Sequence, residues 1–298
     1  MTPALGLELR DSAAAAVALD DAGAVLARAL VPSTGDLAAT ALEAVDGVAR
    51  VAGAGPLGVA ANQTEPTASA AILSLLKQRY TGPFAQVGVT PTGTAAAVAE
   101  AWVGAARGVG DVVFFAVAEH AIAGMIRDGA PVLGVGRRAA SIAWLALNPV
   151  EREDYRKIGC LEAEVAAAGI VRRLIWRIKA GDRSQVADAV GGDFSGITLD
   201  HVLNAARTGD GVSISVVRDT AKYLGMAAAN LVIISDPEKL VLGGIMATAA
   251  DLLFEPVRAE LARRLPRPMI DALAIAPAAL GADAAAIGAA RLATAALQ

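Results

Sequence analysis

Residues 5–30 read LGLELRDSAAAAVALDDAGAVLARAL, and this opening stretch decides the fold class. Its apolar runs predict two strands joined by a tight turn at residues 20–23, where Asp and Gly supply conformations that branched residues disfavour. A near repeat lies further along the chain: residues 111–118 (DVVFFAVA) and 121–126 are apolar runs, followed by a turn and another run at 132–135. The same strand-rich opening therefore occurs twice.

Helical segments follow each opening, because their apolar residues recur near the 3.6-residue period. The elements expected in the first half are a helix at 36–51, a strand at 57–61, a helix at 68–80, a strand at 84–89 and a helix at 95–104. From residue 159 onward helices dominate, except for one buried strand at 239–242 that ends in Gly243 and Gly244. Strands followed by helices, twice over, predict an α/β protein of two related domains with a cleft between them.

The predicted domains differ in size. We expect a small N-terminal domain over residues 1–107 and a larger C-terminal domain over residues 108–298. The last helix, about residues 283–298, is free to return to the N-terminal domain.

Composition and charge exclude several classes of protein. The chain has 298 residues, of which 55% are hydrophobic and 19% charged, so it can bury a full core and is not disordered. Its 26 basic and 30 acidic residues are mixed, and no basic run exceeds two residues, which argues against a nucleic-acid partner. No long apolar segment and no early signal peptide are evident, so we expect no membrane contact and a cytoplasmic location.

Three segments are informative: AAAVAEAW at 95–102, GCLEAE at 159–164 and DPEKLVLGG at 236–244. Together with the helix that ends at Gly209 and Asp210 and the closing segment 280–290, they resemble, in their order along the chain, the ROK family (repressors, open reading frames and kinases). The strongest match is GCLEAE. The resemblance implies an α/β, two-domain actin-like ATPase or sugar-kinase fold with a central cleft, in which family members bind ATP and a hexose, and usually a homodimer.

The first phosphate loop of the family, DxGGT, is altered here. This chain carries Arg10, Asp11 and Ser12 at those positions, so the glycines that let backbone amides approach phosphate are missing. Asp11 also puts a negative charge where phosphate would lie. Arg10 either pairs with an anion or is an exposed turn charge.

The family's catalytic base loop is altered as well. The resemblance puts Thr92 at the position of the base and Pro91 at that of a sugar-binding Asn. A threonine cannot accept a proton near neutral pH, and loss of a positioned base costs about 10²–10⁴-fold in rate. The structural alternative is that Thr92 or Thr94 caps the helix that follows.

The second phosphate loop, GTGxGxG, corresponds to residues 118–124 and keeps only Gly124. Glu119 and His120 stand side by side within it, either as an acid/base pair or as polar loop residues. Neighbours in a turn usually point apart and no third partner is evident, so we expect His120 to be a loop residue that senses pH.

The sugar and zinc positions are mostly replaced. Ser141 and Trp144 stand where the family has a sugar-binding Glu and a zinc-binding His, and in the cysteine run only Cys160 remains. One ligand of four cannot hold a structural zinc, so no metal is expected, and we interpret Cys160 as a buried apolar residue. Glu162 remains at a sugar-side position, where it either binds the ligand or pairs on its helix.

Gly243 and Gly244 remain on the adenosine side, where they either line that site or form a packing turn.

Three hypotheses follow. The favoured one is a sugar-kinase-like protein that has lost phosphoryl transfer and binds a sugar or another small molecule, or regulates, without a cofactor. The alternative is a divergent ATP- and Mg²⁺-dependent hexose or amino-sugar kinase with a substitute base, for which the candidates are Glu8, Asp11, Glu119 and His120. The third is a purely structural protein that acts through dimerisation. Whether the chain is an enzyme stays open at this point.

Overall fold

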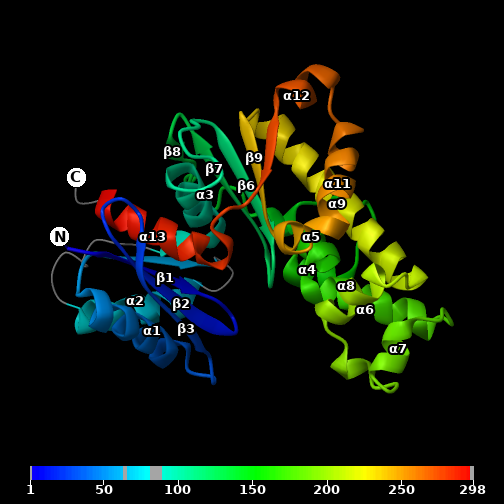
Figure 1. The fold of residues 1–298 in the computed structure, drawn as a ribbon, viewed down its shortest axis with the longest axis horizontal. Coiled ribbons are helices and arrows are strands. Elements are labelled where there is room, and N and C mark those ends of the chain that lie inside the picture. The colour runs from blue at the N-terminus through cyan, green and yellow to red at the C-terminus, as the bar shows by residue number, and fades with distance from the viewer. Residues whose placement is uncertain (1, 63–65, 81–88, 296–298) are drawn as a thin grey trace. The chain divides into compact units, whose positions relative to one another are not determined.

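Two five-stranded sheets organise the protein in the computed structural model, which describes residues 2–62, 66–80 and 89–295 (Figure 1). The described residues form the strands β1 (Ala4–Leu9), β2 (Ala13–Leu19), β3 (Val25–Pro32), β4 (Leu57–Ala61), β5 (Val89–Pro91), β6 (Val112–Val117), β7 (Ala121–Arg127), β8 (Ala130–Pro131), β9 (Lys239–Gly244) and β10 (Ala274–Pro277).

The two sheets have the same strand order. One is β3-β2-β1-β4-β5 and the other is β8-β7-β6-β9-β10, so in each the first three strands form one side and two later strands extend the other. In the first sheet β1 pairs antiparallel with β2 and parallel with β4. This repeated topology supports the interpretation of two related halves.

Helices fill the segments between the strands. Those of the first half are α1 (Leu37–Ala52), α2 (Pro66–Arg79) and α3 (Thr92–Trp102). The later helices are α4 (Glu153–Ile158), α5 (Cys160–Val165), α6 (Ala167–Lys179), α7 (Gln185–Ala189), α8 (Leu199–Arg207), α9 (Gly211–Ser235), α10 (Ile245–Thr248), α11 (Ala250–Ala262), α12 (Arg267–Ala272) and α13 (Ala284–Ala295). Short 3-10 turns occupy Ile142–Trp144, Phe194–Gly196 and Gly281–Asp283.

Several predicted elements need correction. The opening stretch forms three strands, because Arg10 N donates to Ala13 O and turns the chain between β1 and β2. The run at 132–135 is not a strand; β8 ends at Pro131. Strand β10 was not predicted, and most of the strand predicted at 84–89 lies outside the described residues.

The chain divides into two compact units. One comprises Met1–Phe114, Ala123–Ala140 and Ala278–Gln298, and the other comprises Phe115–Ile122 and Ser141–Pro277. The domain boundary predicted after residue 107 stays a prediction. Within the described residues, no helix combines the length and the hydropathy that crossing a bilayer requires.

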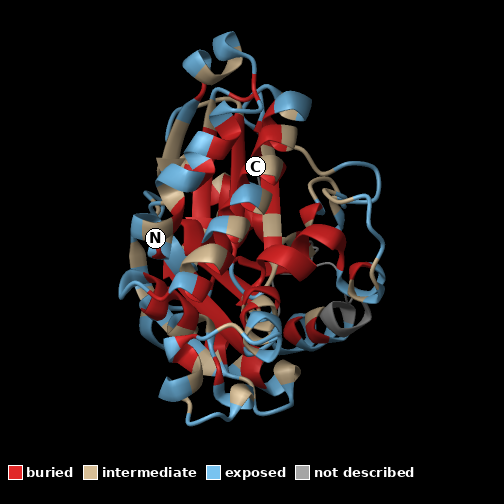
Figure 2. Ribbon diagram, turned by 90° about the vertical axis from the view of Figure 1, so that its right-hand side faces the viewer, coloured by how far each residue is buried: buried red, intermediate tan, exposed pale blue. Residues whose placement is uncertain are grey.

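Small residues let α13 lie directly on the first sheet. β1 and β2 are buried along their whole length; Figure 2 draws all buried residues in red. A Cβ on Gly58 of β4 would lie 1.8 Å from the carbonyl oxygen of Ala289, and one on Gly6 of β1 would lie 1.8 Å from that of Ala286. Since both neighbours are backbone atoms of α13, helix and sheet are as close as glycine permits.

Asp210 fixes the start of the long helix α9. Its carboxylate accepts from Ser213 N at 2.8 Å, from Gln185 N at 2.9 Å and from Ser184 Oγ at 3.0 Å. Burial raises the pKa of the Asp210 carboxyl, but the hydrogen bonds outweigh burial and hold that pKa below its usual range.

We expect Asp210→Asn to lower the free energy of unfolding by about 1–2 kcal/mol at neutral pH, because a cap and two further acceptor contacts weaken. A carboxyl with a lowered native pKa stabilises the fold above its unfolded pKa of about 4, and this contribution is lost as the pH falls through the native pKa. The difference in melting temperature between wild type and variant, measured from pH 7 to pH 3, should therefore shrink below about pH 4. A difference that stays constant down to pH 3 contradicts this assignment.

Candidate functional site

The first phosphate-loop position is occupied by an internal ion pair. Arg10 Nη2 lies 2.6 Å from Glu8 Oε2 and donates to Ala282 O at 2.7 Å. Arg10 is therefore neither an exposed turn charge nor available to an anion without breaking these contacts. Asp11 and Ser12 are exposed at the turn between β1 and β2.

The predicted helix cap at the base loop is wrong. α3 begins at Thr92, its N-cap is Pro91, and no side chain caps it. Thr92 and Thr94 already lie inside the first turn, and the buried Thr94 Oγ1 has no hydrogen-bond partner among the described residues. The base position therefore holds a buried hydroxyl in the first helical turn.

Gly124, retained from the second phosphate loop, has a packing role. A Cβ on Gly124 would lie 2.2 Å from Gly93 O, and one on Gly93 would lie 2.1 Å from Ala123 O. The base loop and the middle of β7 thus touch through their backbones. This contact requires glycine whether or not phosphate binds.

His120 does have a partner, contrary to the sequence-based expectation. Its Nδ1 lies 2.9 Å from Glu162 Oε1, and Glu162 Oε2 accepts from Ala121 N at 3.0 Å. The Glu162 side chain is 9% exposed and that of His120 is 23% exposed. The turn between β6 and β7 thereby holds both carboxylate oxygens in one orientation, while Glu119 is exposed on the same turn.

The family's zinc positions do not fit a zinc ion in this chain. Cys160 is buried in an apolar cluster with Tyr155 and Ala163, and Trp144 is half exposed. Across the described part of the chain, no three His, Cys, Asp or Glu side chains come together as metal ligands. One thiol beside an aromatic ring lacks the donors that tetrahedral zinc needs.

An ionic network that the sequence analysis missed lies beside these positions. Tyr155 Oη donates to Glu164 Oε1 at 2.5 Å, and Arg152 Nη1 donates to the same oxygen at 3.0 Å. Arg173 Nη2 donates to the backbone oxygen of Glu164 at 2.8 Å. Burial, followed by the hydrogen bond to Glu164, raises the pKa of the Tyr155 phenol well above its usual value.

Arg152 also stacks on aromatic rings. Its guanidinium lies 4.7 Å from the centre of the Trp176 ring and 5.0 Å from that of Tyr155. Trp176 thus packs against the Arg152 guanidinium. The only sequence signal for this network was the density of Arg, Asp and Glu between residues 151 and 173.

At the predicted adenosine side, Gly244 ends β9 with a φ of 58°. A Cβ there would lie 1.9 Å from Val117 O on β6, so packing requires the glycine. Gly243 is buried in β9, and Ser141 is exposed before the 3-10 turn. The binding roles given to these positions stay predictions.

Comparisons with known proteins agree on the family. A model described as the ROK family matches residues 59–296. The glucokinase of Halalkalibacterium halodurans is 34% identical over 197 residues, which are 65% of this chain and 59% of that relative. The N-acetylglucosamine repressor of Escherichia coli O157:H7 is 26% identical over 162 residues, 54% of this chain and 38% of that relative. This chain therefore spans less than two thirds of these curated relatives.

Solved structures show the same fold. A ROK family glucokinase from Streptomyces griseus, in complex with glucose and AMPPNP, superposes with a TM-score of 0.82 at 23% identity, over 98% of this chain and 99% of that one. The ROK hexokinase from Thermus thermophilus gives a TM-score of 0.78 at 24% identity, over 100% of both chains. The predicted α/β fold of the actin-like sugar kinases is confirmed.

Proposed function

The chain belongs to the ROK family and is sugar-kinase-like, and from this we propose that it binds a sugar-like small molecule and no longer transfers a phosphoryl group. The observation that carries the proposal is the buried Glu162 carboxylate, held by Ala121 N and His120. Each carboxylate oxygen accepts more than one hydrogen bond, so Glu162 keeps capacity for a ligand hydroxyl. A carboxylate held in one orientation loses little entropy when it binds a polyol.

The loss of phosphoryl transfer is supported by the base position. Thr92 lies inside the first turn of α3, and a hydroxyl near pH 7 does not take the proton of a sugar hydroxyl. A divergent enzyme therefore needs another group to do this.

The phosphate positions support the same conclusion. A nucleotide phosphate near residues 10–12 would be repelled by the Asp11 carboxylate. The Arg10 guanidinium offers little attraction in return, because Glu8 already neutralises it. Phosphoryl transfer depends on positioning and charge stabilisation, and neither is supplied there. These residues do not fit ATP and Mg²⁺, so we propose no cofactor.

The first test is binding. Calorimetric titration with glucose, N-acetylglucosamine and N-acetylmannosamine should give heat of binding for at least one sugar. Glu162→Gln should weaken that binding about tenfold, because a charged acceptor becomes a neutral one. The exposed Glu153→Gln is the control and should bind like the wild type. Equal affinity in wild type and Glu162→Gln refutes the role of Glu162.

One observation favours a second candidate, a divergent ATP-dependent sugar kinase. Glu162 Oε1 at 2.9 Å from His120 Nδ1 is the arrangement in which a carboxylate orients an imidazole as a base. ATP consumption with the sugar that binds, measured for wild type and His120→Asn, separates the two candidates. Turnover that His120→Asn abolishes establishes the kinase, whereas the main proposal expects no turnover in either protein.

The proposal extends to partners and location. We propose a homodimer in the cytoplasm. We propose no nucleic-acid partner, because the net charge is −4 and no run of Lys and Arg exceeds two residues. Sedimentation measures the first point directly: a monomer at micromolar concentration contradicts it.

A further inference from the structure

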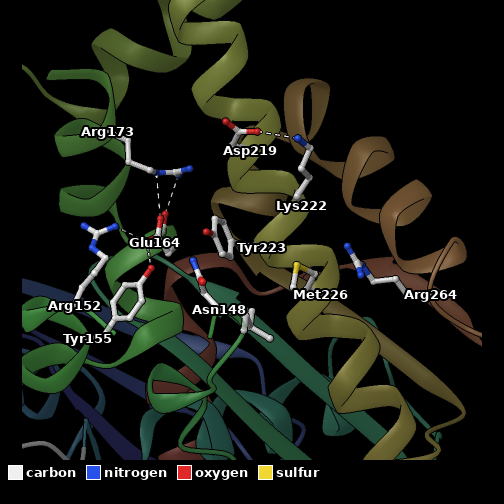
Figure 3. A pocket seen from close by; sticks show the side chains of 11 residues that line it. Asn148, Arg152, Tyr155, Glu164, Arg173, Asp219, Lys222, Tyr223, Met226 and Arg264 are labelled. Atoms are coloured by element: carbon white, nitrogen blue, oxygen red, sulfur yellow. Dashed lines mark hydrogen bonds and ion pairs between the residues drawn. The ribbon is translucent and has the colours of Figure 1, made fainter. Parts of the chain in front are cut away.

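The unit formed by Phe115–Ile122 and Ser141–Pro277 contains a cavity of about 460 Å³. Figure 3 shows Arg152, Tyr155, Glu164 and Arg173 on one side of it and Lys222, Met226 and Arg264 on the other. Asn148 and Tyr223 lie between the two sides. The volume is that of a typical small-molecule site.

The cavity has an excess of positive charge. Four cationic side chains and two carboxylates line it: Arg152, Arg173, Lys222, Arg264, Glu164 and Asp219. Behind this lining, Asp154 and Glu260 add two negative charges and Arg172 and Arg263 add two positive ones, so the excess remains two. An anion that enters is therefore attracted.

Arg173 supplies a donor that lacks an acceptor. Its side chain is 13% exposed and its Nε lies 3.7 Å from Glu164 Oε2, beyond hydrogen-bond distance. No described residue accepts from this Nε, although it is buried. Arg173 Nη2 donates to Glu164 O and to Thr220 Oγ1, so the Nε is the donor that is left over. Burial lowers the pKa of the Arg173 guanidinium despite the nearby Glu164. A buried donor without a partner in the protein indicates that a bound ligand supplies the acceptor.

On the opposite side the cations are accessible. Lys222 Nζ lies 2.9 Å from Asp219 Oδ1, and its side chain is 54% exposed. Arg264 Nε donates to Glu260 at 3.0 Å and its side chain is 41% exposed. Lys222 can turn towards a ligand at small cost, because an exposed ion pair contributes little. Arg264 can turn while Glu260, whose side chain is 7% exposed, keeps its ion pair with Arg263.

This cavity is separate from the Glu162 position. Glu162 and Glu164 stand two residues apart on α5, and residues at that spacing point to different sides of a helix. Glu162 contacts the β6–β7 turn, whereas Glu164 contacts Arg152 and Tyr155. One short helix therefore presents a carboxylate to each of two sites.

We propose that the cavity binds a small organic oxyanion, a polyol-sized molecule that carries a phosphate or a carboxylate group. The oxyanion is bound by Arg173 Nε on one side and by Lys222 and Arg264 on the other. The rings of Tyr155 and Tyr223, with Asn148, contact the uncharged body. Aromatic faces and an amide suit a ring or chain that bears hydroxyl groups.

The test is calorimetric titration of the full chain with glucose 6-phosphate, gluconate, inorganic phosphate and glucose. We expect glucose 6-phosphate or gluconate to bind and binding to weaken with added salt. Arg264→Gln and Lys222→Gln should each weaken it about tenfold, and Arg173→Gln about a hundredfold, with folding checked by melting. Arg258→Gln, on the exposed side of α11, is the matched control and should bind normally.

Two results overturn the proposal: no binding of either organic anion at millimolar concentration, or binding that Arg264→Gln and Lys222→Gln leave unchanged. Binding that only Glu162→Gln weakens also overturns it, because the anion then occupies the other site. Uncharged glucose reports on the Glu162 site separately, so the proposed function can fail or hold independently of this result.

Discussion

The Gly58→Ala variant is expected to lose about 3 kcal/mol of unfolding free energy, at the upper end of the cost of overpacking. The new Cβ would lie 1.8 Å from Ala289 O and 2.4 Å from the Ala289 carbonyl carbon. Side chains can rotate away from such a clash, but here the neighbours are backbone atoms of α13. The helix must therefore move off the sheet and open the packed core beneath it.

Thermal melting of the full chain measures the effect. A loss of about 3 kcal/mol lowers the melting temperature by about 6–12 °C in a protein of this size. The matched control is Gly211→Ala in the first turn of α9, where a Cβ meets no atom within 4 Å. That variant should melt at or slightly above the wild-type temperature, since alanine favours a helix. A Gly58→Ala protein that melts within 2 °C of the wild type contradicts the close approach of helix and sheet.

Local patterns predicted several elements of this fold well. The strand at 57–61 has the predicted bounds, and the helix predicted at 36–51 is α1, Leu37–Ala52. Asp36 explains the good start of that helix, because its side chain accepts from the backbone of Ala38 and Ala39. Where a capping residue and the period of the apolar residues indicate the same helix, the sequence is sufficient to predict its bounds.

Elements without a local signal were missed. β10, Ala274–Pro277, has no alternation of polar and apolar residues and ends in proline. It is a strand because Ile275 pairs with Leu240 of β9, far along the chain. The alanine run in β2 gave no signal for the turn at Arg10, so the separate strands β1 and β2 were predicted as one.

The candidate site shows the same limit more clearly. The partners His120 and Glu162 are 42 residues apart, and nothing near His120 in the sequence indicates a carboxylate. Arg152, Tyr155, Glu164 and Arg173 each look like ordinary residues of polar helix surfaces. Only the packing of α4, α5 and α6 brings them together, and their side chains then form ion pairs and hydrogen bonds with one another.

Replacement of Glu164 is expected to cost more than any other single change in the second unit. Its side chain is 3% exposed and faces Arg152, Arg173 and the Tyr155 hydroxyl. Glu164→Leu leaves two guanidinium groups close together without this counter-charge. Removal of one partner from a buried ion pair costs about 3–5 kcal/mol, because the remaining charge is still desolvated. Chemical denaturation of wild type and variant, followed by circular dichroism, measures this loss.

A double variant separates the lost charge from lost packing. Glu164→Leu combined with Arg173→Met removes one of the two cations that lose their counter-charge and fills the space with apolar atoms. We therefore expect the double variant to recover about half of the lost free energy. The exposed pair Glu153–Lys157 on α4 supplies the control, and Glu153→Gln should change the unfolding free energy by less than about 0.5 kcal/mol. If the double variant is as unstable as the sum of its two single variants, Glu164 and Arg173 are not coupled.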